Sequence, residues 1–232
     1  MAPASRRPFA RRAERGLSMV ELLVGTAIAL FIAATGATML AGNLRENRAL
    51  LLEARLMQDL RSAADVITRD LRRAGYWDAA TSGVWTAGAA SAATNPYTAV
   101  SPGAAASDAV SFRYSRDVNE NNAVDGNEQF GFRLRNGAIE MQLGAANWQA
   151  LTDTGTLRVT AFDVTPTVQD IDLQGYCASA CPAGSATCPP HQQVRSLAVA
   201  ITGRLVGDAG VSRSVRSQVR LRNDPVIGAC AT

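Results

Sequence analysis

Hydrophobic residues dominate one segment of the chain, residues 17–44, on every side of the helix that it would form. Glu21 is the only charged residue within residues 17–42. Residues 22–42 are uncharged and mostly apolar, and as a helix they would span about 31 Å, enough to cross a bilayer. A carboxylate at the edge of such a segment is costly unless a partner balances it. Glu21 is therefore a candidate functional residue.

The pattern changes between residues 45 and 75, where apolar residues recur at spacings of three and four. These positions predict the buried face of an amphipathic helix: Leu56, Leu60, Ala63, Ala64, Ile67, Leu71 and Ala74. No proline or glycine interrupts residues 44–74, and Gly75 is placed to end the helix as a C-cap. We therefore expect one continuous helix over residues 17–74, about 87 Å long.

Alternating patterns typical of β-strands follow the helix. The candidate strands are residues 109–115, 129–135, 138–143, 156–168, 194–206 and 211–222. Asn136 and Gly137 predict a two-residue hairpin between the second and third of these strands. Residues 78–107 are expected to form a long loop, partly ordered by Trp85 and Tyr97. The simplest architecture is α+β, with an antiparallel sheet packed on the amphipathic half of the helix.

A basic leader precedes the hydrophobic segment, with five arginines and one acid in residues 1–16. A secretory signal would have a shorter apolar run and a small-residue cleavage site after it. The arginine excess predicts that the leader stays in the cytoplasm and that the chain beyond the membrane segment is exported. A plain signal-anchored membrane protein is the simplest alternative.

The net charge changes once the leader is set aside. The whole chain has 23 basic and 20 acidic residues, whereas residues 17–232 have 18 and 19. The apparent basicity therefore belongs to the leader, and we expect no nucleic-acid partner.

Residues 15–23 (RGLSMVELL) resemble the class III signal of type IV pilins and type II secretion pseudopilins. The resemblance implies that prepilin peptidase cuts between Gly16 and Leu17 and that the new N-terminus is methylated at Leu17. It also implies that Glu21 pairs with the N-terminal amine of a neighbouring subunit, so that each charge offsets the desolvation cost of the other. The sequence departs from the family pattern at Leu17, where phenylalanine is usual, and at Thr38, in the region where major pilins often have a kinking proline.

Residues 69–77 (RDLRRAGYW) and 215–224 (VRSQVRLRND) are similar to segments of PilW-type minor pilins. The resemblance implies a pilin-like α+β protein that crosses the inner membrane once before assembly and is part of the pilus after assembly. Through its N-terminal helix it would contact other minor pilins and the major pilin, and it would help to initiate or cap the type IV pilus. The inner-membrane assembly platform and a tip adhesin are further implied partners. The implied parts are a leader (1–16), an assembly half-helix (17–44), an amphipathic half-helix (45–75) and a β-rich periplasmic domain (76–232).

Two other functions are open on the sequence alone. A type II secretion pseudopilin of the J type would share the leader and the helix. A pilus-tip binding module for a surface or DNA would use the loops, although a near-neutral mature chain argues against strong DNA binding. The sequence has no nucleophile elbow, phosphate-binding glycine loop or metalloprotease helix, so we do not expect an enzyme.

An acidic stretch at residues 117–128 (DVNENNAVDGNE) has the spacing of a twelve-residue calcium loop. The candidate ligands are Asp117, Asn119, Asn121, Asp125 and Glu128 through side chains and Ala123 through its carbonyl. Asn122 replaces the glycine usual at the sixth position, and asparagine tolerates the left-handed conformation well. Calcium is therefore the candidate cofactor, and a polar turn without metal is the alternative.

Four cysteines lie in the part expected to be exported: Cys177, Cys181, Cys188 and Cys230. An even number in an oxidising compartment predicts two disulfides, and the sequence does not distinguish the three possible pairings. A zinc site formed by three of these cysteines with His191 is the alternative, although its spacing is not that of a standard finger.

Overall fold

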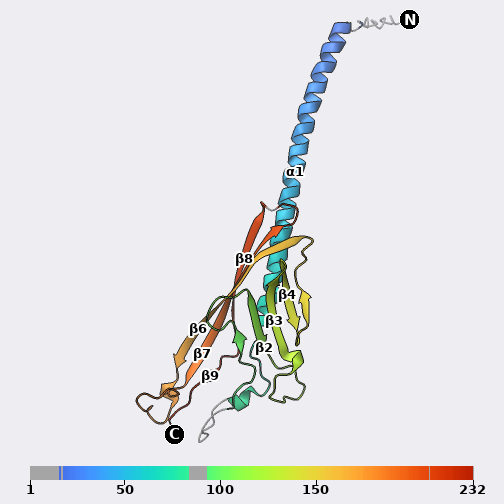
Figure 1. The fold of residues 1–232 in the computed structure, drawn as a ribbon. Helices are drawn as coiled ribbons and strands as arrows, with labels where there is room; N and C mark the ends of the chain where they lie inside the picture. The colour runs from blue at the N-terminus through green and yellow to red at the C-terminus, as the bar shows by residue number, and fades with distance from the viewer. Residues whose placement is uncertain (1–15, 17, 84–92, 209, 232) are drawn as a thin grey trace, which may run out of the picture. The chain divides into compact units, whose positions relative to one another are not determined.

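The computed structural model describes residues 16, 18–83, 93–208 and 210–231. The chain forms two compact units, residues 1–50 and residues 51–232. Helix α1 (Met19–Leu71) runs from the first unit into the second, which contains the strands (Figure 1). The prediction of one uninterrupted helix is confirmed. The helix ends three residues earlier than expected, and residues 72–75 form a turn.

Within the second unit, α1 buries one stripe of side chains, as the spacing predicts. The buried residues of the helix are Leu56, Leu60, Ala63, Ala64, Ile67, Thr68 and Leu71. Six of these seven were predicted from the apolar repeat; Thr68 joins them, and its hydroxyl donates a hydrogen bond to the Asp65 carbonyl at 3.3 Å. The helix therefore supplies one wall of a hydrophobic core.

The first sheet is an antiparallel meander in chain order. Its strands are β1 (Val100–Ser101), β2 (Ala109–Arg113), β3 (Gln129–Arg135), β4 (Ala138–Leu143) and β5 (Trp148–Ala150). Asn136 and Gly137 have φ values of 52° and 82° and join β3 to β4, so the predicted hairpin is confirmed.

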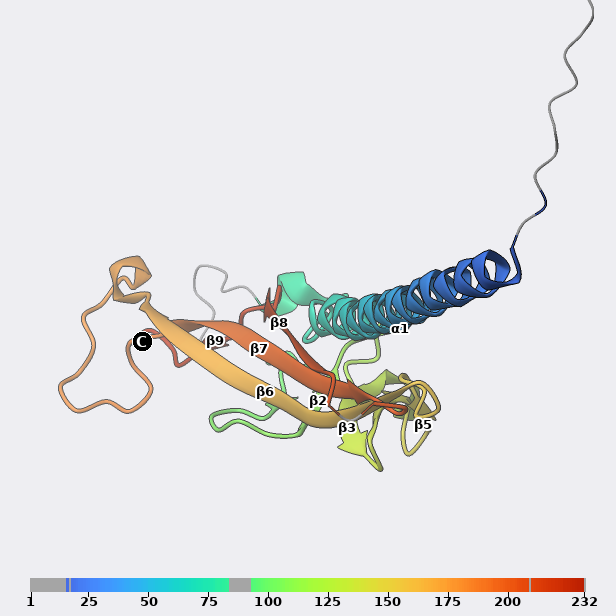
Figure 2. The ribbon, with the colours of Figure 1, turned by 90° about the horizontal axis from the view of Figure 1, so that it is seen from above.

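The second sheet has four strands: β6 (Leu157–Asp172), β7 (His191–Leu205), β8 (Ser212–Arg220) and β9 (Val226–Ile227). Strand β7 lies between β6 and β8, and β9 pairs with its first residues (Figure 2). A bridge between Ser107 and Val164 links β6 to the chain just before β2. The strands are thus divided between two sheets, where the sequence suggested one. Three short 3-10 helices complete the unit: η1 (Ala80–Gly83), η2 (Gly126–Glu128) and η3 (Gln174–Tyr176).

One hydrophobic core joins the helix stripe to both sheets. Its largest fully buried side chains include Phe112, Phe132 and Phe162. A Cβ at Gly203 of β7 would lie 2.6 Å from Leu157 Cδ1 and 3.1 Å from Leu60 Cδ2. The absence of a side chain at this position therefore lets the helix stripe pack closely against β7.

Candidate functional site

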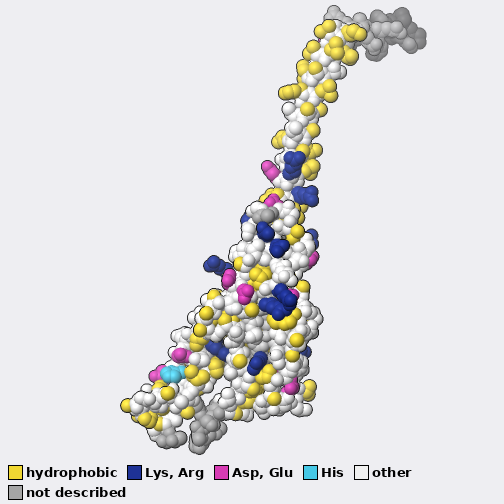
Figure 3. Space-filling model, in the orientation of Figure 1, with side chains coloured by type: hydrophobic (Ala, Val, Ile, Leu, Met, Phe, Trp, Pro, Cys, Tyr) yellow, Lys and Arg dark blue, Asp and Glu magenta, His cyan; other side chains and the backbone are white. Residues whose placement is uncertain are grey.

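The first part of α1 presents apolar side chains that nothing in its own unit buries. Leu30 and Phe31 are each 72% exposed, and the helix is long and apolar enough to cross a membrane. Figure 3 shows hydrophobic and uncharged side chains along this segment. A helix that is apolar on all sides requires either lipid or other helices around it.

The threonine hydroxyls of this segment donate hydrogen bonds to backbone carbonyls of the same helix. Thr26 donates to the Leu23 carbonyl at 3.0 Å, and Thr38 donates to the Thr35 carbonyl at 2.8 Å. Such bonds remove hydroxyl donors that lipid could not satisfy. The helix continues through Thr38 without a break.

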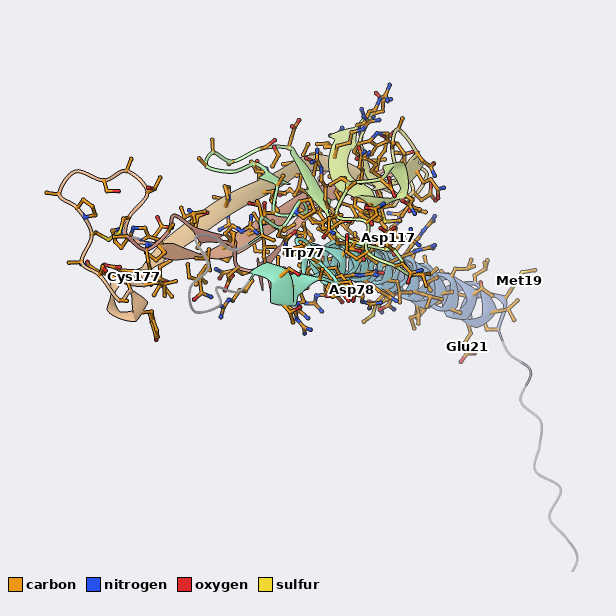
Figure 4. All side chains as sticks on the ribbon, turned by 90° about the horizontal axis from the view of Figure 1, so that it is seen from below. Met19, Glu21, Trp77, Asp78, Asp117 and Cys177 are labelled. Atoms are coloured by element: carbon orange, nitrogen blue, oxygen red, sulfur yellow. A yellow bond between two sulfur atoms is a disulfide. The ribbon has the colours of Figure 1, made fainter. Side chains whose placement is uncertain are left out.

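Glu21 lies in the first turn of α1 and is exposed, with its side chain directed away from the helix (Figure 4). Within the described residues its carboxylate has no hydrogen-bond or ion-pair partner. No described residue therefore balances its charge. Gly16 is exposed, whereas Leu17, the expected site of methylation, lies outside the described residues.

The C-terminal end of α1 is fixed by a dense set of contacts. Gly75 has a φ of 75°, the left-handed conformation of a C-cap, and its N–H donates to the Arg113 carbonyl at 2.8 Å. The Asn95 side chain donates to the Gly75 carbonyl at 2.9 Å. The Arg73 guanidinium lies 4.4 Å from the ring centroid of Tyr114, within cation–π range. The turn therefore joins the end of the helix to β2 and to Tyr114, the residue that follows β2.

The two segments that resemble PilW-type minor pilins meet at this turn. The Asn223 side chain donates to the Ala74 carbonyl at 3.2 Å, and a Cβ at Gly75 would lie 3.3 Å from Asn223 Cβ. Segments 69–77 and 215–224 are thus two sides of one structural junction.

The junction also contacts the acidic loop. Trp77 is buried, and its Nε1 donates to Asn122 Oδ1 at 2.9 Å. The Asp78 N–H donates to Glu120 Oε2 at 3.4 Å. Figure 4 shows Trp77 and Asp78 on the same side of the second unit as Asp117. The loop therefore packs on the end of the helix and is not a free surface turn.

Inside the loop, the predicted ligand side chains bond to one another. Asp117 Oδ2 accepts the Asn121 N–H at 3.2 Å, and Asn121 Nδ2 donates to Asp125 Oδ2 at 3.0 Å. Asn119 is exposed. Asn122 has a φ of 57°, which confirms the left-handed conformation expected at the sixth position.

The hydroxyl of Tyr97 lies where the loop's seventh and twelfth positions converge. Its oxygen is 2.9 Å from the Ala123 carbonyl, 3.4 Å from Glu128 Oε1 and 3.0 Å from Glu120 Oε1. Glu128 is fully buried and also accepts the N–H groups of Arg116 and Asp125, both at 2.8 Å. A tyrosine hydroxyl thus contacts two of the oxygens that a calcium ion would need.

The titration of this cluster follows from its burial and hydrogen bonds. Burial, together with the hydrogen bond to Glu120, raises the pKa of the Tyr97 hydroxyl. Burial alone would raise the pKa of Glu120, but the nearby Ser115 hydroxyl and the hydrogen bonds from the Asn122 N–H, the Tyr97 hydroxyl and the Asp78 N–H together lower it. Among the described residues, the buried Ser115 oxygen has no hydrogen-bond partner. Tyr97 is therefore a neutral donor to the ionised carboxylate of Glu120.

Calcium binding stays a prediction. Across the residues that the structure describes, no group of three or more His, Cys, Asp or Glu side chains is arranged to hold a metal ion. The loop oxygens at positions 1, 5, 7, 9 and 12 already have hydrogen-bond partners within the protein.

The four cysteines form two disulfides, Cys177–Cys230 and Cys181–Cys188, with Cα–Cα distances of 5.4 and 5.5 Å. This selects one of the three possible pairings. Cys177 lies at the end of the β6–β7 hairpin (Figure 4). With all four sulfur atoms in disulfides, no thiolate is free to hold zinc, and the zinc alternative is excluded for this state.

The family comparison decides the class of this protein. Residues 49–221, more than half of the chain, match the family described as prepilin peptidase-dependent protein B. The chain belongs to the prepilin peptidase-dependent protein B family. This membership supports a pilin-related protein that depends on prepilin peptidase, in agreement with the leader resemblance. The searches of curated proteins and of solved structures each found no match.

The family match and the leader motif cover different residues. The match begins at residue 49, within α1, and contains the helix stripe and strands β1–β8. Gly16, Leu17 and Glu21 lie before it and depend on the resemblance of their own segment. Two different regions of the chain therefore support, independently of each other, a pilin-related protein.

Sequence reasoning missed the part played by Tyr97 and Glu120. Tyr97 was expected only to help order the loop at residues 78–107, and Glu120 was not among the candidate ligands. The signal for Tyr97 was a large aromatic residue in a stretch of small ones. Its contacts with residues 26 and 31 positions later are not readable from that stretch. Trp85, the other aromatic residue of this loop, lies outside the described residues.

Proposed function

We propose that this protein is a PilW-type minor pilin that helps to initiate or cap the type IV pilus. Prepilin peptidase cuts it between Gly16 and Leu17, and Leu17 is then methylated. The observation that carries the proposal is the exposed apolar segment of α1 with one acid, Glu21, in its first turn. That segment continues as one helix into a unit of the prepilin peptidase-dependent protein B family.

The proposed orientation follows from charge. The leader arginines remain in the cytoplasm, α1 crosses the inner membrane, and residues 76–232 lie in the periplasm. The two disulfides support this orientation, because disulfides persist in the bacterial periplasm and are rare in the cytosol.

Assembly proceeds through the exposed half of α1. Its apolar side chains pack against the corresponding helices of other minor pilins and the major pilin. Glu21 pairs with the N-terminal amine of a neighbour, so neither charge is left alone in a low-dielectric environment. The assembly platform and a tip adhesin are the further proposed partners.

The test replaces the acid and leaves the cut site intact. Glu21→Ala is compared with Glu46→Ala, an acid of α1 outside the uncharged segment, in a host that lacks its own copy. We expect pili per cell to fall more than about tenfold for Glu21→Ala only, because removing one partner of a buried pair costs about 3–5 kcal/mol. Mass spectrometry of both variants should show a methylated Leu17.

Other results would separate the alternatives. Wild-type piliation by Glu21→Ala contradicts the role of that acid. An intact leader contradicts the pilin route altogether. Normal piliation with lost protein secretion in the deletion strain identifies a J-type pseudopilin. Normal assembly with lost attachment or DNA uptake identifies a tip binding module.

Calcium binding by residues 117–128 is a separate part of the proposal. Because the Tyr97 hydroxyl contacts the Ala123 carbonyl and Glu128, calcium must displace it from those oxygens. Tyr97→Phe removes the competing donor and keeps the ring. We expect that variant to bind calcium about tenfold more tightly than the native protein, the equivalent of one hydrogen bond to a charged group.

Calorimetry of the full-length protein in detergent measures this affinity. The indole of Trp77, bonded to Asn122, gives a second signal in fluorescence. Asp117→Ala should abolish binding in the Tyr97→Phe background, whereas Asp108→Ala, an exposed acid outside the loop, should not. If neither the native protein nor the Tyr97→Phe variant gives calcium-dependent heat, the loop is a polar turn without metal.

A further inference from the structure

The two outer strands of the four-stranded sheet have different free edges. On β6, Val164 is already bridged to Ser107, and Pro166 follows two residues later on the same edge without an N–H to offer. Proline and partial coverage are common ways to block an edge strand. In the part of the chain that the structure describes, the outer edge of β8 has neither a proline nor a bridge to another segment.

The hydrogen-bonding pattern shows which backbone groups of β8 point away from β7; of these, the Ser212 carbonyl already accepts a hydrogen bond from the Arg213 guanidinium at 2.8 Å. The Leu221 N–H donates to the Arg195 carbonyl and the Leu205 N–H donates to the Val211 carbonyl, so odd-numbered residues bond to β7. The N–H and C=O groups of even-numbered residues therefore point to the open edge. These residues are all exposed: Ser212, Ser214, Arg216, Gln218 and Arg220. The edge is nine residues, or about 30 Å, long.

Arginines gather along this edge and past its end. A shallow hollow of about 480 Å³ is lined by Arg72, Gln218, Val219, Arg220, Leu221 and Arg222, none of which is acidic. Arg220 pairs with Asp224 at 2.7 Å but remains 63% exposed. Among the described residues, Arg72, Arg216 and Arg222 have no ion-pair partner. The free edge therefore carries uncompensated positive charge.

We propose that the open edge of β8 binds an extended acidic segment of a neighbouring protein subunit as an added strand. The partner's backbone pairs with the even-numbered residues, and its carboxylates enter the arginine-lined hollow. A polyanion such as DNA would satisfy the arginines but offers no regular row of donors to the free carbonyls. This surface serves either a pilus or a secretion filament, so it is independent of the choice between them.

The probe is a blocked ten-residue peptide of alternating threonine and glutamate, and its control has glutamine in place of glutamate. Full-length protein in detergent is measured by fluorescence anisotropy and by residue-resolved hydrogen exchange. The glutamate peptide should bind and slow exchange at the amides of Ser214, Arg216, Gln218 and Arg220. Binding should weaken with salt, because the arginines are exposed.

Two variants separate the backbone contribution from the charge contribution. Gln218→Pro removes an outward N–H that β7 does not use and should abolish binding, whereas Gln218→Thr should preserve it. Arg222→Glu should weaken binding at least about tenfold, whereas Arg135→Glu, on the other sheet, should not. If Gln218→Pro fails to fold, the hydrogen-exchange pattern of the native protein and the affinity of Arg222→Glu still test the proposal.

Three results would overturn the proposal. One is peptide binding without protection of the four amides, and another is equal affinity for the glutamine peptide. The third is tighter binding of a single-stranded DNA 20-mer that survives Gln218→Pro, which would assign the arginines to a polyanion. Absence of all binding would overturn it as well and would indicate that the arginines protect the edge against aggregation.

Discussion

Helix α1 contains two segments that are equally helical and very differently buried. Residues 22–42 are exposed throughout, although most of them are apolar. Residues 51–71 carry many charges and nevertheless bury seven side chains, of which Leu60 is 0% exposed. Helix formation is therefore not what distinguishes the two segments.

The difference lies in the arrangement of apolar residues around the helix axis. An apolar stripe at spacings of three and four faces one partner, which the same chain supplies as two sheets. Apolar residues on all sides of a helix need apolar surroundings on all sides, such as lipid or several other helices, and the described part of this chain's first unit has no such elements. The first segment thus requires lipid or other helices around it, whereas the second packs on the protein's own strands.

The sharpest test of this difference is the same substitution in each segment. Leu60→Ala should destabilise the second unit by about 3–5 kcal/mol, because it leaves a cavity in a fully buried stripe beside Gly203 and Leu157. Leu30→Ala, at a position 72% exposed, should leave that stability unchanged. Guanidinium denaturation of full-length protein in detergent, followed by near-ultraviolet circular dichroism, measures both.

Equal effects of the two substitutions would break the comparison. A large effect of Leu30→Ala would mean that the first segment stabilises the strands. A negligible effect of Leu60→Ala would mean that burial of the helix stripe contributes little to the stability of the second unit.

Patterns within short windows predicted most of the fold. The six predicted strands are all present, with β3 and β4 matching their expected bounds. The unpredicted strands β1, β5 and β9 have two or three residues, too few for alternation to be recognised. The division into two sheets was not predictable, since it depends on which strands pair.

Local geometry of the candidate sites was also predictable, but contacts over long separations were not. Asn122 and Gly75 have the left-handed conformations that their positions demand. The contacts of Tyr97 with the acidic loop and the pairing of Cys177 with Cys230 join residues far apart in sequence. Composition and spacing carry no information about such pairs.

The smallest expected effect concerns an ion pair near the start of the second segment. Arg213 of β8 forms an ion pair with Glu53 of α1, and both side chains are more than a third exposed. Solvent screening limits such a pair, so a double-mutant cycle of Glu53→Gln and Arg213→Gln should give a coupling of about 0.2–1 kcal/mol. The coupling should fall further in 1 M salt. A salt-independent coupling as large as the effect of Leu60→Ala would show that charge, and not the apolar stripe, attaches this segment of the helix to its sheet.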